Sequence, residues 1–116
     1  MNKVILHGRI ARDADVRTTQ SGQTVARTSI AVDRGKSKDG KDNGADFIPC
    51  VAWGKTAELL GNYFPKGKEI LAEGRIQTGS YEKDGKKVYT TDVILDRVEF
   101  CGSAKKQEES DDNIPF

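Results

Sequence analysis

Residues 46–82 read DFIPCVAWGKTAELLGNYFPKGKEILAEGRIQTGSYE, and this stretch decides the fold. Residues 46–53 are rich in aromatic and β-branched side chains, which favour a strand. The following segment, 55–64, carries apolar residues on one stripe of a helix, namely Ala57, Leu60 and Phe64. Pro65 ends that helix, and residues 68–82 return to a strand pattern. The stretch therefore predicts a strand, a short helix and a second strand.

The segments on either side add further strands and turns. Residues 3–33 alternate between apolar and polar side chains around a turn at 20–23, QSGQ, which predicts strands. Residues 34–46 contain several Gly and four Lys or Arg, and they predict a basic loop. The sequence KDGK at 83–86 is typical of a hairpin turn, after which residues 87–100 form the last strand.

About five strands with one helix between the third and the fourth predict an all-β fold class with one short helix. A five-stranded Greek-key barrel with a helix in that position is the OB-fold arrangement, and we expect it over residues 1–101. Pro49 has no N–H to donate to a sheet, so its strand should lie at an edge or bulge there. Residues 102–116, GSAKKQEESDDNIPF, show no periodicity and predict a short disordered linker and acidic tip.

The chain has 116 residues, 35% hydrophobic and 32% charged, which is enough for one domain with a modest core. Its apolar runs are too short for a transmembrane helix or a signal peptide, so we expect no membrane association and a cytoplasmic location. The net charge is +1, but all 19 Lys and Arg lie within residues 1–106, whereas residues 108–116 hold four acids and no cation. The basic body suggests a polyanionic partner, and the acidic end suggests a different, basic one.

The motif most suggestive of an enzyme is WGKT at 53–56. A phosphate-binding loop needs a Gly five residues before the Gly of its GK pair, and Pro49 occupies that position. The intervening residues belong to a strand, so their N–H groups are committed to a sheet. His7 is the single histidine, and nothing marks a catalytic partner for it. We therefore expect no catalytic residues and no enzyme activity.

Metal and cofactor sites are also unexpected. The two cysteines, Cys50 and Cys101, lie far apart without a CxxC spacing. Zinc needs about four ligands, and His7 is the single histidine. The acids of the loop 34–46 do not follow the spacing of a calcium loop. Both cysteines are therefore interpreted as reduced thiols, and neither a metal nor a cofactor is predicted.

Three aromatic residues, Phe47, Trp53 and Tyr81, are interleaved with cations. Phe47 and Trp53 lie an even number of positions apart, so they project from one face of an undistorted strand. Unpaired bases stack on such rings while Lys and Arg neutralise phosphates. Alternatively, the three rings fill a core, where we also expect Tyr63 and Phe64 of the helix. The pattern alone leaves both interpretations of the three rings open.

Four stretches taken together resemble the bacterial single-stranded DNA-binding protein family, with its phage and plasmid-borne members. They are NKVILHGRIARDADVRTTQSG, ADFIPCVAWGKTAELLGNYFPKG, EGRIQTGSYEKDGKKVYTTDVI and the ending DDNIPF. The resemblance implies an OB-fold homotetramer that binds single-stranded DNA without sequence preference during replication, recombination and repair. It implies no catalysis and no cofactor. It also implies a cytoplasmic location, at the nucleoid or, for a phage protein, in the host cytoplasm.

The resemblance also assigns roles to individual residues. It implies base stacking by Phe47, Trp53 and Tyr81. Positions that are commonly basic in the family, and that would contact phosphates, are occupied by Lys3, Arg34, Lys55 and Lys66, with Arg75 nearby.

The acidic end of the chain is interpreted as a docking peptide for replication, recombination and repair proteins. Phe116 would enter an apolar pocket of the partner with its terminal carboxylate held by a cation. Pro115 would limit the conformations lost on binding, while Asp111 and Asp112 would meet a basic rim. A merely solubilising tail would explain the acids but not the apolar tip, which also includes Ile114.

Two other functions share part of this pattern. An OB-fold module that binds RNA would use the same rings and cations but does not explain the acidic tip. A protein-interaction adaptor would use the tip but needs no nucleic acid.

Overall fold

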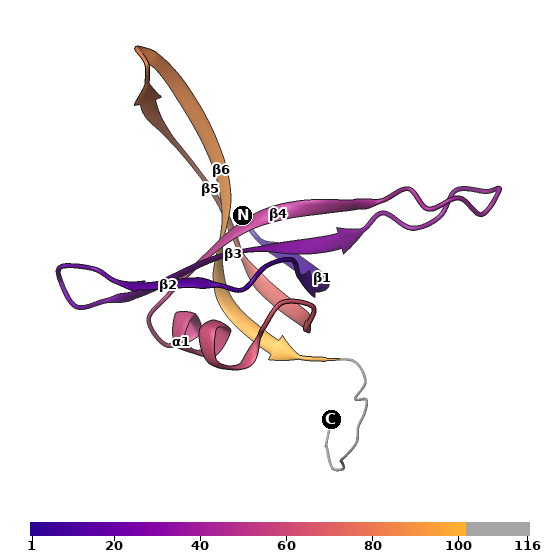
Figure 1. Ribbon diagram of the computed structural model, residues 1–116, viewed down its shortest axis with the longest axis horizontal. Helices are drawn as coiled ribbons and strands as arrows, with labels where there is room; N and C mark the ends of the chain where they lie inside the picture. Colours follow the sequence, from indigo (N-terminus) through magenta and orange to yellow (C-terminus); the bar gives the residue numbers. More distant parts are fainter. Residues whose placement is uncertain (102–116) are drawn as a thin grey trace, which may run out of the picture.

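The computed structural model describes residues 1–101, which contain six strands and one helix (Figure 1). In chain order these elements are β1 (Val4–Ile10), β2 (Asp15–Thr18), β3 (Thr24–Asp33), β4 (Ala45–Trp53), α1 (Gly54–Tyr63), β5 (Glu69–Lys83) and β6 (Lys86–Phe100). The helix lies within one residue of its predicted bounds. The predicted linker and docking tip, residues 102–116, lie outside the described residues.

Five of these strands close into a barrel. Each pairs with the next in the order β1, β5, β6, β4, β3, and the ring closes where β1 pairs with β3 at Arg9–Ala31 and Ile10–Ile30. The β4–β6 pair is parallel, and the other pairs of the ring are antiparallel. The expected five-stranded OB-fold barrel is therefore confirmed. The sixth strand, β2, lies outside the ring and pairs antiparallel with β3.

Pro49 lies in β4 where one edge of the strand has no partner among residues 1–101. It is the Cα partner of Ser29, whose carbonyl accepts a hydrogen bond from the Ala11 N–H and therefore points away from β4. On the other side, β4 pairs with β6 only from Cys50 to Ala52. The proline nitrogen thus falls on an unpaired edge, as expected, and the β3–β4 register runs through it without a bulge.

The core lies inside the ring, and α1 packs against β2, β3, β4 and β6. Leu60 of the helix and Phe64 directly after it are buried together with Ile30 and Ile70. Tyr63 is 55% exposed, so its prediction as a core residue is wrong. It is the last residue of the helix and lies edge-on to a second surface ring, Phe100. No helix within residues 1–101 is long and apolar enough to span a membrane.

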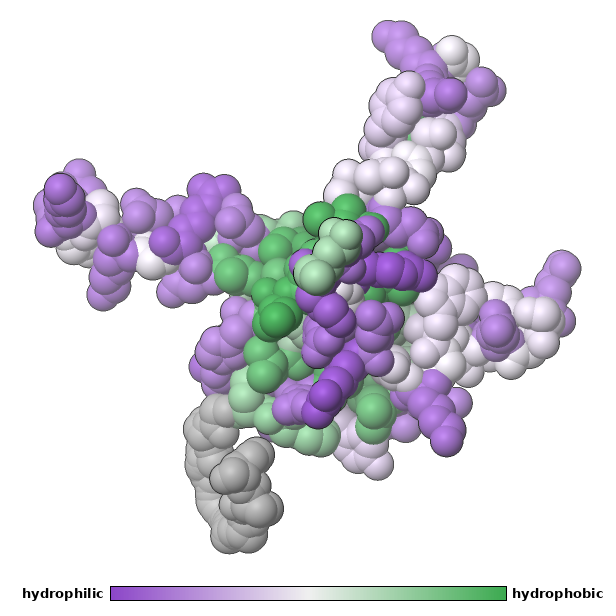
Figure 2. Space-filling model, turned by 180° about the vertical axis from the view of Figure 1, so that it is seen from behind, coloured by the Kyte–Doolittle hydropathy of each residue, from purple (hydrophilic) through white to green (hydrophobic). Residues whose placement is uncertain are grey.

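Three projections leave the barrel (Figure 1): the β2–β3 hairpin, the β3–β4 loop and a long β5–β6 arm. Figure 2 shows hydrophilic residues toward their tips and hydrophobic residues gathered between their bases. The arm ends in the predicted turn, where Asp84 and Gly85 have φ values of 52° and 78°. Two consecutive positive φ angles define the type I′ turn of a two-residue hairpin.

The arm begins at Gly74, where β5 leaves the barrel. The β5–β6 register shifts between Glu73 and Gly74, and a Cβ at Gly74 would lie 2.0 Å from the carbonyl oxygen of Ile94. The glycine therefore lets the two strands approach closely at this point. Beyond it, every β5 residue from 75 to 83 is exposed.

Candidate nucleic-acid interface

The three aromatic residues selected from the sequence lie on the outer surface of the barrel. Phe47 is 67% exposed, Trp53 43% and Tyr81 53%. Within β4, Cys50 and Ala52 point into the core, so the alternation of the strand directs both Phe47 and Trp53 outward. Their exposure excludes the interpretation that these rings fill the core.

Val51 of β4 and Ile94 of β6 are the buried centre of this outer face. They are Cα partners in the parallel pair, and with Val25 they form an apolar cluster separate from the core. Arg27 of β3 pairs with Val51, and Arg75 of β5 pairs with Ile94. The strands therefore align Arg27, Val51, Ile94 and Arg75 across the outer face. We call these four residues the central row, because an arginine lies at each end of an apolar pair.

The three rings lie around the central row in different directions. Phe47 is four residues from Val51 along β4, or about 13 Å, and Trp53 is two residues from it on the other side. Tyr81 is six residues from Arg75 along the arm, or about 20 Å. Figure 1 shows β4 and the arm diverging from the place where they cross. The rings are thus spread over the outer surface on two diverging elements.

Sequence reasoning missed Arg27. It is exposed between the buried residues Ala26 and Thr28 of β3, so the strand alternation directs it outward. That alternation was visible in the sequence. Its position opposite Val51, in one row with Arg75, depends on strand pairing that the sequence pattern does not define.

Two of the predicted phosphate-binding cations already have acidic partners. The Lys3 Nζ lies 2.5 Å from a Glu73 carboxylate oxygen, and this hydrogen bond lowers the pKa of Glu73. The Arg34 Nη2 lies 2.7 Å from Asp46 Oδ1, and Asp46 directly precedes Phe47. These acids position both cations on the surface, and a phosphate would have to compete with them.

Lys55 and Lys66 lie at opposite ends of α1. Lys55 is exposed in the first turn, two residues after Trp53. Lys66 follows the helix, and its backbone N–H donates to Asp13 Oδ1 at 2.8 Å. Because the helix has 10 residues, it is about 15 Å long. The structure therefore brings Lys55, but not Lys66, close to Trp53.

Tyr89 is a further exposed ring on the arm that the sequence pattern did not single out. It pairs with Ser80, the neighbour of Tyr81, so the two tyrosines project from opposite faces of the arm. The Lys87 Nζ lies 6.0 Å from the centre of the Tyr89 ring. The arm thus presents an aromatic side chain on each face.

The fold and the site together define a small OB-fold barrel whose outer surface carries exposed rings among basic side chains. Comparison with known proteins agrees with this class. The model of the Single-strand binding protein family matches residues 1–101. The chain belongs to this family, which confirms the resemblance found in the sequence. Its members are binding proteins, in agreement with the expectation that the chain is not an enzyme.

Proteins of similar sequence align with most of this chain. A protein of Fusobacterium nucleatum named single-stranded DNA-binding protein is 53% identical over 107 residues, covering 90% of this chain and 69% of its own length. One of the same name from Clostridium tetani is 51% identical over 109 residues, covering 92% and 74%. Single-stranded DNA-binding protein 3 of Clostridium acetobutylicum is 44% identical and covers 98% of this chain and 81% of its own length.

Proposed function

We propose that this protein binds single-stranded DNA without sequence preference, through the outer surface around the central row. The observation that carries the proposal is the exposure of Phe47, Trp53 and Tyr81 around a row with an arginine at each end. Every base has a flat face that can stack on a ring, and each stacked base contributes roughly 1–3 kcal/mol. Relatives named for single-stranded DNA binding support the same function.

The phosphates of the bound strand would meet cations on both sides of the rings. Arg75 and Arg27 flank the apolar pair directly, and Lys55 lies beside Trp53. Lys3 and Arg34 would exchange their carboxylate partners for phosphates. Contact with Lys66 requires that the bound DNA continue past the C-terminal end of α1.

Fluorescence titration with oligo-dT tests the proposal, because Trp53 is the single tryptophan. We expect quenching that saturates, and we expect it to weaken as salt is added, since phosphate binding releases counterions. Unchanged Trp53 emission together with unchanged electrophoretic mobility at saturating oligo-dT would contradict the proposal. An oligo-rU competitor separates the RNA-binding alternative, which predicts displacement at equal or lower concentration than oligo-dT.

We further propose a homotetramer that works in the cytoplasm, coating and protecting single-stranded DNA during replication, recombination and repair. Exposed apolar residues on the outer face of β1 and β5, Ile5 and Leu71, support assembly because subunit contacts would cover them. Native mass measurement with and without oligo-dT reports assembly and ligand together. A monomer at micromolar concentration in both samples would contradict the tetramer.

Recruitment of replication, recombination and repair proteins is proposed for the acidic tip. The sequence supports it, since Asp111 and Asp112 precede an apolar ending, Ile114, Pro115 and Phe116. Deletion of residues 113–116 is expected to abolish partner binding and leave the OB-fold domain, residues 1–101, able to bind oligo-dT. Partner binding that survives this deletion, with DNA binding intact, would favour a solubilising tail. The adaptor alternative predicts partner binding by a protein that never binds DNA.

A further inference from the structure

Three potential metal ligands from three neighbouring strands meet on the barrel surface. Glu69 begins β5 and pairs with Arg9 of β1, two residues from His7. Ile70 pairs with Phe100 of β6, so the next residue, Cys101, lies beside Glu69. The imidazole nitrogen of His7, the Glu69 carboxylate and the Cys101 thiol all lie within 4.8 Å of one another. The sequence predicted no such group, because these residues are far apart along the chain.

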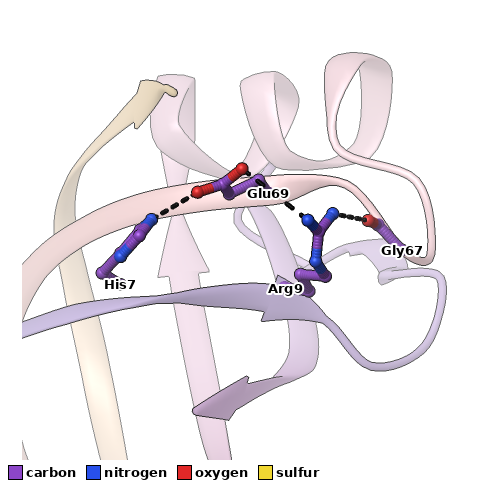
Figure 3. A network of polar contacts seen from close by, with 4 residues as sticks. All are labelled: His7, Arg9, Gly67 and Glu69. Atoms are coloured by element: carbon purple, nitrogen blue, oxygen red, sulfur yellow. Dashed lines mark hydrogen bonds and ion pairs between the residues drawn. The ribbon is translucent and has the colours of Figure 1, made fainter. Parts of the chain in front are cut away.

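The carboxylate of Glu69 is the centre of this cluster. The His7 Nε2 lies 2.5 Å from Glu69 Oε2 (Figure 3). The Cys101 thiol lies within 4.8 Å of the Glu69 carboxylate, and its pKa is raised first by burial and then by this carboxylate. A proton therefore lies in the His7–Glu69 hydrogen bond, and the Cys101 sulfur carries another. A metal ion that binds such ligands displaces these protons.

The combination of donors selects the chemical class of the ion. Calcium and magnesium prefer sets made of oxygen alone. Imidazole, thiolate and carboxylate suit Zn²⁺ and similar first-row ions, with metal–ligand distances of about 2.0–2.3 Å. At those distances, donor atoms in a tetrahedral site lie about 3.5 Å apart. The His7–Glu69 contact has to open by about 1 Å. The His7 side chain is 61% exposed in the single chain, and in the proposed tetramer it would move beside the contacts that cover its neighbour Leu71.

The surroundings leave room for a further ligand. A cavity of about 330 Å³ is lined by His7, Arg9, Glu69 and Asp33, among others. It opens beside two of the three donors and is large enough for a water molecule. The carboxylate of Asp33 adds negative charge to the same cavity.

We propose that His7, Glu69 and Cys101 bind one Zn²⁺-type transition-metal ion on each chain, with water in the fourth position. The ion joins Cys101, directly after β6, to β1 and β5. It therefore connects the residue that follows β6 to the two neighbouring strands of the ring.

Two cations, Lys68 and Arg9, oppose the ion, and Arg9 is the one that also contacts Glu69. Its Nη2 lies 3.8 Å from Glu69 Oε1, and its Nη1 donates to the Gly67 carbonyl at 3.1 Å (Figure 3). The guanidinium competes for the carboxylate and repels a cation. If the ion binds at Glu69, removal of the Arg9 charge should therefore tighten metal binding.

Titration of the full chain with Zn²⁺ and with Co²⁺ tests the site. We expect one ion per chain and, with Co²⁺, the absorption bands of a tetrahedral site that includes a thiolate. Cys101→Ser should remove the thiolate band, and His7→Gln should weaken Zn²⁺ binding at least tenfold. Cys50→Ala is the matched control with the other thiol removed, and it should keep the band. Arg9→Gln should tighten Zn²⁺ binding several-fold.

Two results overturn the proposal. One is Zn²⁺ binding of equal strength in the wild type and in Cys101→Ser, which would indicate acidic side chains elsewhere in the chain. The other is the absence of a thiolate–cobalt band in a wild type with native circular dichroism. His7→Gln and Cys101→Ser replace surface or half-buried residues, so thermal unfolding without metal should match the wild type and show that both variants fold. Added Zn²⁺ should then raise Tm more in the wild type than in His7→Gln or Cys101→Ser.

Discussion

Trp53 lies opposite Val25 across the antiparallel β3–β4 pair, and Val25 is buried although it points out of the barrel. The indole is thus the outer neighbour of a buried apolar side chain and is itself less than half exposed. Phe47 lies opposite Ala31 on the same face and is more exposed. The two rings differ in how much each contributes to the fold.

Replacement of either ring by alanine should weaken DNA binding, but only one replacement should destabilise the fold noticeably. Loss of one stacked base, roughly 1–3 kcal/mol, corresponds to about 5- to 150-fold in Kd for oligo-dT. We expect Phe47→Ala to change the free energy of unfolding by less than about 0.5 kcal/mol, and Trp53→Ala to reduce it by about 1 kcal/mol. Urea unfolding and filter binding measure the two effects. If both variants bind oligo-dT with the wild-type affinity per folded molecule, the stacking role is contradicted.

The two arginines of the central row should each account for one phosphate in the salt dependence. For single strands, the slope of log K against log salt is about −0.7 for each neutralised phosphate. Arg27→Ala and Arg75→Ala should therefore each make the slope shallower by about 0.7.

Lys68→Ala is the control for this measurement. This substitution removes the same charge, but Lys68 directly precedes β5, at the end of that strand away from the arm, and its Nζ lies 5.6 Å from the centre of the Phe100 ring. Its slope should equal that of the wild type. Wild-type slopes in Arg27→Ala and Arg75→Ala as well would show that the phosphates do not contact these two arginines.

Gly74→Ala should disturb the barrel where the arm begins. The added Cβ would meet the Ile94 carbonyl oxygen at 2.0 Å, and backbone has to shift to relieve the contact. We expect a loss of about 1–3 kcal/mol in the free energy of unfolding. Gly79→Ala, in the exposed arm, has Thr90 Oγ1 as its nearest neighbour at 3.2 Å and should stay close to the wild-type value. Thermal unfolding that shows equal stability in the two variants would contradict the close approach.

The two thiols should differ in reactivity toward an aromatic disulfide reagent at pH 8. Burial raises the pKa of Cys50 to about 12, so almost no thiolate forms there in the folded protein. Cys101 is half-buried, and its raised pKa slows its reaction without preventing it. We expect one thiol per chain to react in the native state and the second only in denaturant. Cys101→Ser should leave no native reaction; rapid modification of Cys50 in that variant would show that the core opens readily.

The amino-acid sequence alone determined the local features of this protein. Helical spacing predicted α1, the KDGK turn predicted the tip of the arm, and the missing N–H of Pro49 predicted an unpaired edge. The even spacing of Phe47 and Trp53 put both rings on one face. Each of these features depends on residues a few positions apart, where backbone geometry limits the outcome.

Only the tertiary structure decided which faces meet and which are left exposed. The parallel pairing of Val51 with Ile94 created the central row and gave Arg27 its place in it. Helix packing left Tyr63 at the surface although its spacing suited the core. The meeting of His7, Glu69 and Cys101 likewise required β1, β5 and β6 to lie side by side. Pairing between distant strands is selected by closure of the whole barrel around one core, and no short stretch of sequence contains that information.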